Sequence, residues 1–199
     1  MYDKYQNENS EQTKIFDVAM KLMEEVGYEG LSIRKICNKA GISTGKFYTY
    51  FQSKQDLLCH YYAKVENVLR KDLADKFTNM DLKSQIIEFY KTYMDYTASF
   101  GIEFVINYFN PHNEMMDIFS RTNFIMEMTD QFMEDALKKG YMFPENKGIH
   151  QLSMEICMII KGIIFTWSAT HGAFSLSDMT VSILGGALDG MLPGCGQVK

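Results

Sequence analysis

Basic side chains gather in one short stretch of the chain, residues 32–54, whose sequence is SIRKICNKAGISTGKFYTYFQSK. This stretch contains five basic residues and no Asp or Glu, although the whole chain has a formal net charge of −5. The basic residues are Arg34, Lys35, Lys39, Lys46 and Lys54. Because Lys and Arg side chains pair with phosphate oxygens, this stretch is suited to contact a polyanion such as nucleic acid.

The same stretch predicts two short helices joined by a tight turn. In the first helix the apolar residues recur at positions i, i+3, i+4 and i+7, as Ile33, Ile36, Cys37 and Ala40. In the second helix Phe47 and Phe51 stand four residues apart and share one side. Ser32 and Ser43 precede the two helices as N-caps, and Gly41 occupies the turn, where a residue without Cβ bends at least cost. The pattern is that of a helix-turn-helix.

The second helix would present a short polar face to solvent. If Phe47 and Phe51 are buried, then Thr44, Tyr48 and Thr49 point outward with Lys46 at the edge. A helix with such side chains can lie in the major groove of DNA and contact base edges and phosphates. The alternative interpretation is an ordinary solvated face of a helical hairpin.

An ordered set of residues extends this pattern over residues 13–58. Its members are Gly27-Tyr28 after a first helix, Arg34 in the second, Ala40-Gly41-Ile42-Ser43 in the turn, Gly45, Phe47-Tyr48, Phe51, Ser53-Lys54 and Leu57-Leu58. In this the run resembles the N-terminal DNA-binding domain of the tetracycline-repressor (TetR) family of transcriptional regulators. The resemblance is specific over roughly the first quarter of the chain and general, in helical character and length, over the rest.

The resemblance implies a set of DNA contacts. Transferred position by position, these are Arg34, Thr44, Lys46, Tyr48, Tyr50 and Lys54. Arg34 is the best candidate for a base contact, since arginine pairs bidentately with guanine. Lys54 and Tyr48 are better suited to position the DNA backbone. The alternative for Tyr48 is a ring packed on the hairpin with its hydroxyl in water.

Length predicts one small and one medium domain, and the resemblance implies that these are an N-terminal DNA-binding domain over residues 1–54 and a ligand-binding and dimerisation domain over residues 55–199. The chain has 199 residues, of which 46% are apolar, which is enough for a real core. Residues 1–54 carry eight Lys or Arg against seven Asp or Glu, whereas the remainder carries twelve against eighteen. A local basic patch on an acidic body favours docking on DNA in one orientation.

Hydrophobic periodicity predicts an all-α fold, with a three-helix head and a larger helical body, about nine helices altogether. Ser53 with Asp56 three residues later makes a capping-box start for the fourth helix, and Pro111 forces a break after the sixth. Beside the two helices of the hairpin, the expected helices span about 10–26, 53–77, 81–99, 102–109, 114–139, 148–170 and 177–192.

The body contains candidates for an effector pocket. Twelve of the fifteen methionines lie in residues 80–199, together with many aromatic residues, and such side chains make adaptable apolar walls. The candidate lining residues are Phe89, Tyr93, Tyr96, Phe100, Phe104, Tyr108, Phe124, Met128, Phe132 and Trp167. They favour a small hydrophobic or aromatic effector. The alternative is that the same stripes are plain hydrophobic core.

The last two expected helices carry broad apolar faces that favour a homodimer. The candidate interface residues are Ile156, Ile160, Ile163, Ile164, Leu184, Leu188 and Met191. Two protomers could bury these faces in a four-helix bundle around a two-fold axis. That axis would place two recognition helices about one DNA turn (~34 Å) or a multiple apart, so the operator would be palindromic. The alternative is that these helices form only intramolecular core.

Other classes of function receive little support from the sequence. Neither a catalytic motif, a phosphate-binding glycine loop nor a metal-ligand spacing is seen, so we expect no enzyme, no metal and no cofactor. The N-terminus lacks the order of a signal peptide and apolar runs are interrupted, so we expect no membrane segment and a cytoplasmic location. The predicted function is a repressor that binds double-stranded operator DNA and is relieved by its ligand. The alternatives are a ligand-responsive activator and a helical protein-interaction module.

Overall fold

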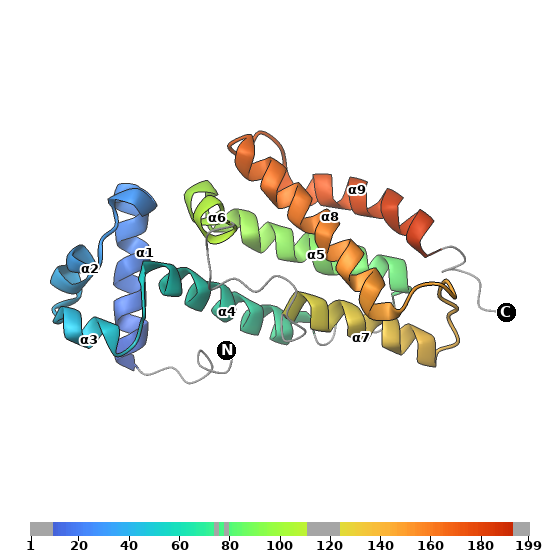
Figure 1. Cartoon of the computed structure of the whole chain (residues 1–199), viewed down its shortest axis with the longest axis horizontal. Coiled ribbons are helices and arrows are strands. Elements are labelled where there is room, and N and C mark those ends of the chain that lie inside the picture. The colour runs from blue at the N-terminus through green and yellow to red at the C-terminus, as the bar shows by residue number, and fades with distance from the viewer. Residues whose placement is uncertain (1–9, 74–75, 78–79, 111–123, 193–199) are drawn as a thin grey trace. The chain divides into compact units, whose positions relative to one another are not determined.

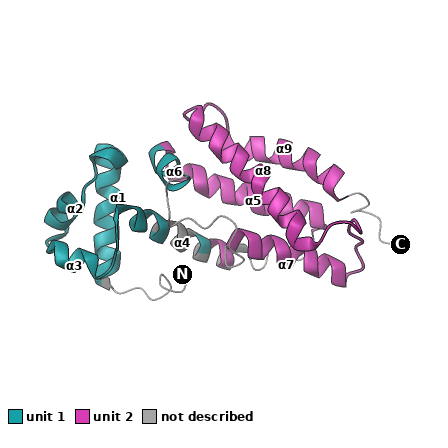
Figure 2. Cartoon of the chain, viewed as in Figure 1, with its two compact units in different colours: residues 1–68, 103–116 teal, residues 69–102, 117–199 magenta. Residues whose placement is uncertain are grey.

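The computed structural model describes residues 10–73, 76–77, 80–110 and 124–192. Within these ranges the regular secondary structure is helical throughout, in nine helices, which confirms the predicted all-α class (Figure 1). The chain forms two compact units, unit 1 with residues 1–68 and 103–116 and unit 2 with residues 69–102 and 117–199 (Figure 2). This clustering does not test where a DNA-binding function ends, so the boundary between residues 54 and 55 stays a prediction.

Unit 1 contains the head. Helix α1 (Ser10–Gly30) is interrupted at Gly27, whose φ of 70° and ψ of 170° end the regular helix where the sequence predicts its end. Helices α2 (Ile33–Ala40) and α3 (Thr44–Tyr48) follow, and α2 packs against both α1 and α3. The core of the head is apolar, with Ile15, Ala19, Ile36, Phe47, Phe51 and Leu57 all buried.

Helix α4 (Lys54–Leu73) starts with a cap, as predicted. The Ser53 hydroxyl accepts a hydrogen bond from the Asp56 N–H at 3.1 Å. In a capping box the Asp56 carboxylate would accept a hydrogen bond from the N–H of Ser53. Here it accepts one from the N–H of the preceding residue, Gln52, at 2.7 Å. The helix ends four residues before the predicted Phe77, and residues 74–75 lie outside the described ranges. Helix α6 (Ile102–Tyr108) groups with unit 1 from residue 103 onward.

Unit 2 is a bundle of helices. Helix α5 (Leu82–Ser99) packs mainly against α9 (Leu176–Met191), and α8 (Ile149–Ala169) packs against both α9 and α7 (Phe124–Lys138). Figure 1 shows α8 and α9 side by side. The predicted beginning of α7 at residue 114 and the break at Pro111 lie outside the described residues.

Aromatic rings fill the core of unit 2. The Phe89 ring meets the rings of Tyr90, Phe124 and Phe132 edge to face, with centroids 5.1 to 5.8 Å apart. Phe77 packs on Phe132 in the same way at 5.0 Å. The buried Tyr90 hydroxyl shares a 2.8 Å hydrogen bond with the hydroxyl of Thr129. The polar group of this core tyrosine is therefore hydrogen-bonded.

Helix α8 has the length and apolar composition of a membrane span, unlike what the sequence led us to expect. Core helices of soluble bundles share these properties. In unit 2 the residues Leu152, Ile156, Ile160 and Ile164 of α8 are buried by the neighbouring helices, which explains the apolar residues on that side of the helix.

Candidate nucleic-acid interface

The turn between α2 and α3 is built from local signals. The Ser32 hydroxyl accepts from the Lys35 N–H at 3.3 Å and begins α2, and the Ser43 hydroxyl accepts from the Lys46 N–H at 3.1 Å and begins α3. Gly41 ends α2 in the left-handed region, with φ 72° and ψ 37°. These three positions match the predicted caps and turn. They set the direction in which α3 leaves the hairpin.

Helix α3 is anchored by its aromatic side. Phe47 and Phe51 are completely buried, with ring centroids 5.5 Å apart. The opposite side is open, since Thr44 and Thr49 are exposed and Tyr48 is 56% exposed with its ring edge-to-face on Phe47 at 5.6 Å. The outward residues are therefore held on a rigid base, as an element that enters a groove requires.

Arg34 is an exposed, positively charged residue on α2. Its side chain is exposed, and in the part of the chain that the structure describes it has no hydrogen-bond or ion-pair partner. Its guanidinium group keeps all five donors available for an external acceptor. Thr44, at the N-terminal end of α3, is likewise exposed. These two predicted contact residues are ready for an external partner.

Lys46 and Tyr50 are instead joined to Glu11 of α1. The Lys46 ammonium lies 2.8 Å from Glu11 Oε2, and the Tyr50 hydroxyl donates to the same oxygen at 2.8 Å. The Lys46 Nζ also lies 5.4 Å from the centroid of the Tyr50 ring. The hydrogen bonds from Lys46 and Tyr50 hold the pKa of Glu11 below its ordinary value, and Glu11 raises the pKa of Lys46. The carboxylate and the ammonium group both remain charged at neutral pH.

Lys54 is also engaged inside the head. Its ammonium donates to the Tyr28 carbonyl oxygen at 2.8 Å and lies 3.8 Å from the centroid of the Tyr28 ring. Burial raises the pKa of Tyr28 to about 12, so the ring beneath the cation stays neutral. Lys54 therefore links the start of α4 to the end of α1, a role beyond the predicted contact with the DNA backbone.

Two further basic residues of the stretch are occupied internally. The Lys39 ammonium contacts both Glu25 oxygens, at 2.7 and 2.8 Å, and Lys35 donates to the Gly30 carbonyl oxygen at 2.7 Å. Sequence reasoning missed Glu11 and Glu25 as partners. Their positions on the first helix would have been a usable signal only with knowledge of how that helix crosses the hairpin.

The predicted effector residues are spread over both units. Phe104 and Tyr108 lie on α6 in unit 1, where their rings stack with centroids 5.8 Å apart. Phe89, Tyr93, Phe124 and most of the others belong to unit 2 and are largely buried in its core. The assignment of an effector site to them stays a prediction.

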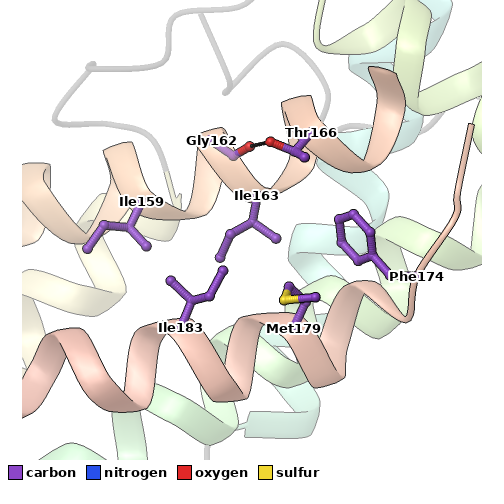
Figure 3. Close-up of a pocket in the computed structure, with 7 residues that line it drawn as sticks. All are labelled: Ile159, Gly162, Ile163, Thr166, Phe174, Met179 and Ile183. Atoms are coloured by element: carbon purple, nitrogen blue, oxygen red, sulfur yellow. Dashed lines mark hydrogen bonds between the residues drawn. The ribbon is translucent and has the colours of Figure 1, made fainter. Parts of the chain in front are cut away.

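A groove of about 370 Å³ opens elsewhere in unit 2, between α8 and α9 (Figure 3). Ile159 and Ile163 line it from α8 and face Met179 and Ile183 of α9, with Phe174 at one end. The remaining lining residues are Gly162 and Thr166, whose hydroxyl donates to the Gly162 carbonyl oxygen at 2.9 Å. The groove is therefore apolar and belongs to the two helices for which a partner protomer is predicted.

The predicted interface residues on these helices are already largely used inside the protomer. Of the predicted set, Ile156, Ile160, Ile163, Ile164, Leu184 and Leu188 are buried in unit 2. The exposed large apolar residues of the same helices are Met158 and Phe165 on α8 and Met179 and Ile183 on α9, with Phe165 67% exposed. An apolar surface thus exists on α8 and α9, offset from the predicted residues.

The described residues contain no group of His, Cys, Asp or Glu side chains able to hold a metal ion. Cys37, Cys59 and Cys157 are buried thiols, and burial raises the pKa of Cys37 and Cys157. Such thiols are poor nucleophiles.

Comparison with known proteins places the head in a family. Residues 15–60 match the model of bacterial regulatory proteins of the tetR family. The HTH-type transcriptional regulator YerO of Bacillus subtilis is 27% identical over 167 residues, which are 80% of this chain and 55% of that protein. The chain thus spans about half the length of the first curated relatives that it matches.

Solved structures share the whole fold. FadR of Thermus thermophilus, a TetR-family repressor in complex with lauroyl-CoA, superposes with a TM-score of 0.74 at 14% identity, covering 94% of this chain and 96% of the other. FadR of Bacillus subtilis in complex with stearoyl-CoA gives a TM-score of 0.65 at 17% identity, covering 92% and 98%. Residues 15–60, with the capped helix-turn-helix and its outward polar face, therefore form a domain of the tetR family of bacterial regulatory proteins.

Proposed function

We propose that the chain binds a DNA operator through α2 and α3, with Arg34, Thr44, Lys46, Tyr48, Tyr50 and Lys54 as the contact residues. The observation that carries this proposal is the orientation of α3. Its buried rings, Phe47 and Phe51, leave Thr44 and Tyr48 exposed, while Arg34 is unpartnered within the described residues. Arg34 reads a base, and Tyr48 and the lysines contact the backbone.

The regulator acts as a homodimer in this proposal. Met179 and Ile183 line the groove between α8 and α9, and Met158 and Phe165 are exposed on α8; a second copy of the chain would cover them. A two-fold axis through that surface presents two heads to one duplex, which calls for a palindromic operator with half-sites about one helical turn (~34 Å) apart or a multiple of it.

The effector in this proposal is an acyl thioester of coenzyme A or a similar long apolar molecule, bound by residues 55–199. Two proteins of the same fold are described in complexes with lauroyl-CoA and stearoyl-CoA. Support from this chain is the core of unit 2, where Phe89 meets Phe124 and Phe132 edge to face and the methionines Met94, Met126 and Met133 are also buried. Rings and methionines in such a core can shift to admit an apolar chain.

Ligand binding relieves repression by favouring the form of the dimer that does not fit DNA. A ligand changes this equilibrium only through its different affinity for the two forms. A coupling free energy of ~1 to 3 kcal/mol would lower operator affinity about 5- to 150-fold. The output is then repression in the cytoplasm that ends when the effector accumulates.

The test is a fluorescence anisotropy titration of the purified protein on DNA from upstream of its own coding sequence, with random DNA of equal length as the control. We expect operator binding that is tighter than random binding and weakens with salt. Equal affinity for both DNAs would contradict the proposal. Lauroyl-CoA is then added, with free coenzyme A as its control; unchanged operator affinity would exclude this effector class and leave DNA binding intact.

A further inference from the structure

The Glu11 carboxylate occupies a place suited to an anion on the surface of the head. Two donors from α3 and its C-terminal flank converge on one oxygen, the Lys46 ammonium and the Tyr50 hydroxyl, each at 2.8 Å. An ammonium and a hydroxyl at this spacing are also the groups that hold a phosphate oxygen. Lys46 and Glu11 are both partly exposed, at 43% and 41%, so solvent and an incoming anion can reach the pair.

The same contact conflicts with DNA binding. Both Lys46 and Tyr50 belong to the proposed contact set, and the Lys46 N–H and Tyr50 O–H that are directed at Glu11 cannot donate to a phosphate at the same time. Neutral pH does not release the contact by itself, since the hydrogen bonds keep the pKa of Glu11 below its ordinary value.

We propose that Glu11 is an internal competitor of DNA: in the free head its carboxylate holds Lys46 and Tyr50, and a backbone phosphate of the duplex replaces it on binding. The inference rests on the proposed DNA-binding function of α3. Glu11 would thereby reduce the affinity for operator and random DNA alike, because a phosphate must first displace it from Lys46 and Tyr50. It would also keep the two side chains pointing toward the place that the phosphate takes.

The first test is the isosteric Glu11→Gln variant, measured on operator and on random DNA at low salt. We expect about 3- to 10-fold tighter binding to both DNAs alike, since phosphate contacts carry no sequence information. The gain should shrink as added salt screens the charges. The thermal midpoint of the variant should stay equal or fall slightly, opposite in sign to the gain in affinity. Weaker binding by Glu11→Gln would overturn the proposal and make Glu11 a supporting residue.

Glu25→Gln is the matched control. Glu25 lies on the same helix and pairs with an exposed lysine, Lys39, at 2.7 Å, but Lys39 lies outside the proposed contact set. We expect its DNA affinity to stay within about twofold of the parent. An equal gain for both variants would show a general effect of charge and would contradict a specific competition.

The second test places Glu11→Gln on a Lys46→Ala/Tyr50→Phe background, which lacks both donors. If Glu11 acts by holding those groups, its removal has no further effect there. A gain that survives would mean that Glu11 repels DNA on its own, and the proposed competition would be wrong. A parent protein that binds no DNA would refute the proposed function. If the parent binds DNA and the Glu11→Gln variant binds it with the same affinity, only the proposed competition is refuted.

Discussion

The ammonium of Lys54 lies 3.8 Å from the centroid of the Tyr28 ring and 2.8 Å from the carbonyl oxygen of the same residue. One side chain thus makes a cation–π contact and a charge-assisted hydrogen bond to the segment just after Gly27, where the regular helix α1 ends. Lys54 therefore belongs to the scaffold of the head as well as to its proposed DNA surface.

Lys54→Ala should consequently affect both stability and binding. We expect the free energy of unfolding to fall by about 1 to 3 kcal/mol from the lost hydrogen bond and ring contact. Affinity should fall alike for operator and random DNA, with a flatter dependence on salt. Urea unfolding and salt-dependent titrations measure the two effects. Lys39→Ala is the control, and an equal loss of stability there would argue against the special role of Lys54.

Arg34→Ala should change which DNA sequence is preferred. Its free guanidinium is the proposed base contact, so its loss should cost about 1 to 3 kcal/mol on the operator and less on random DNA. Selection of bound DNA from a random pool, with the neighbouring Lys35→Ala as control, measures the preference. Equal losses on operator and random DNA would assign Arg34 to the backbone.

Phe47 and Tyr48 are adjacent in sequence and opposite in role. Phe47→Ala removes a completely buried ring and should lower the stability of the head by about 3 to 5 kcal/mol. Tyr48→Ala changes an exposed side chain, so stability should stay within about 0.5 kcal/mol while DNA affinity falls. Thermal unfolding followed by circular dichroism, beside DNA titration, separates them. A destabilised Tyr48→Ala would mean that its ring mainly supports the hairpin.

The exposed apolar face of α8 and α9 should control assembly. In the Phe165→Asp/Ile183→Asp variant, charges placed on this face should convert a dimer into monomers. The affinity for a palindromic operator should then fall about tenfold or more, because two linked heads bind more tightly than one. Sedimentation measures the mass. Leu137→Asp on α7 is the matched control, since Leu137 is also exposed, at 53%, on another helix.

Asp81 should make the stability of unit 2 depend on pH. Its carboxylate caps α5, accepting from the Ser84 hydroxyl at 2.6 Å and from the Ser84 N–H at 3.1 Å. The Ser84 hydroxyl bond is the main reason that the pKa of Asp81 lies below its ordinary value of 3.8. The stabilisation is therefore complete above that value and is lost as pH falls through the lower pKa of the folded state.

The matching variant is Asp81→Ala, which should lose about 0.5 to 2 kcal/mol at pH 7. Its thermal midpoint should approach that of the parent as pH falls toward 3, because the parent then loses the same contact. A constant difference between the two proteins at every pH would show that the charge of Asp81 is unimportant.

Local signals explain what could be read directly from the sequence. The caps Ser32 and Ser43 and the turn at Gly41 act over three or four residues, and the buried pair Phe47 and Phe51 follows from helical spacing alone. Such interactions are complete within one hairpin, so they leave a pattern in the chain. For the same reason the predicted helices lie close to the observed ones, although several predicted ends differ from the observed ends by a few residues.

Contacts between distant residues could be found only in the folded chain. Glu11 meets Lys46 and Tyr50 across more than thirty positions, and Lys54 reaches back to Tyr28, because α1 crosses the hairpin at one particular angle. Periodicity also fails on a helix that is apolar nearly all round. On α8 it could not distinguish Ile160, buried in the protomer, from Phe165, which faces solvent. The order of residues along the chain is thus enough to indicate the resemblance to the tetR family, the helical fold and the helix-turn-helix. Which cations have no partner among the described residues, and which apolar side of α8 and α9 stays exposed, depend on what the neighbouring helices cover and follow only from the packing of the folded chain.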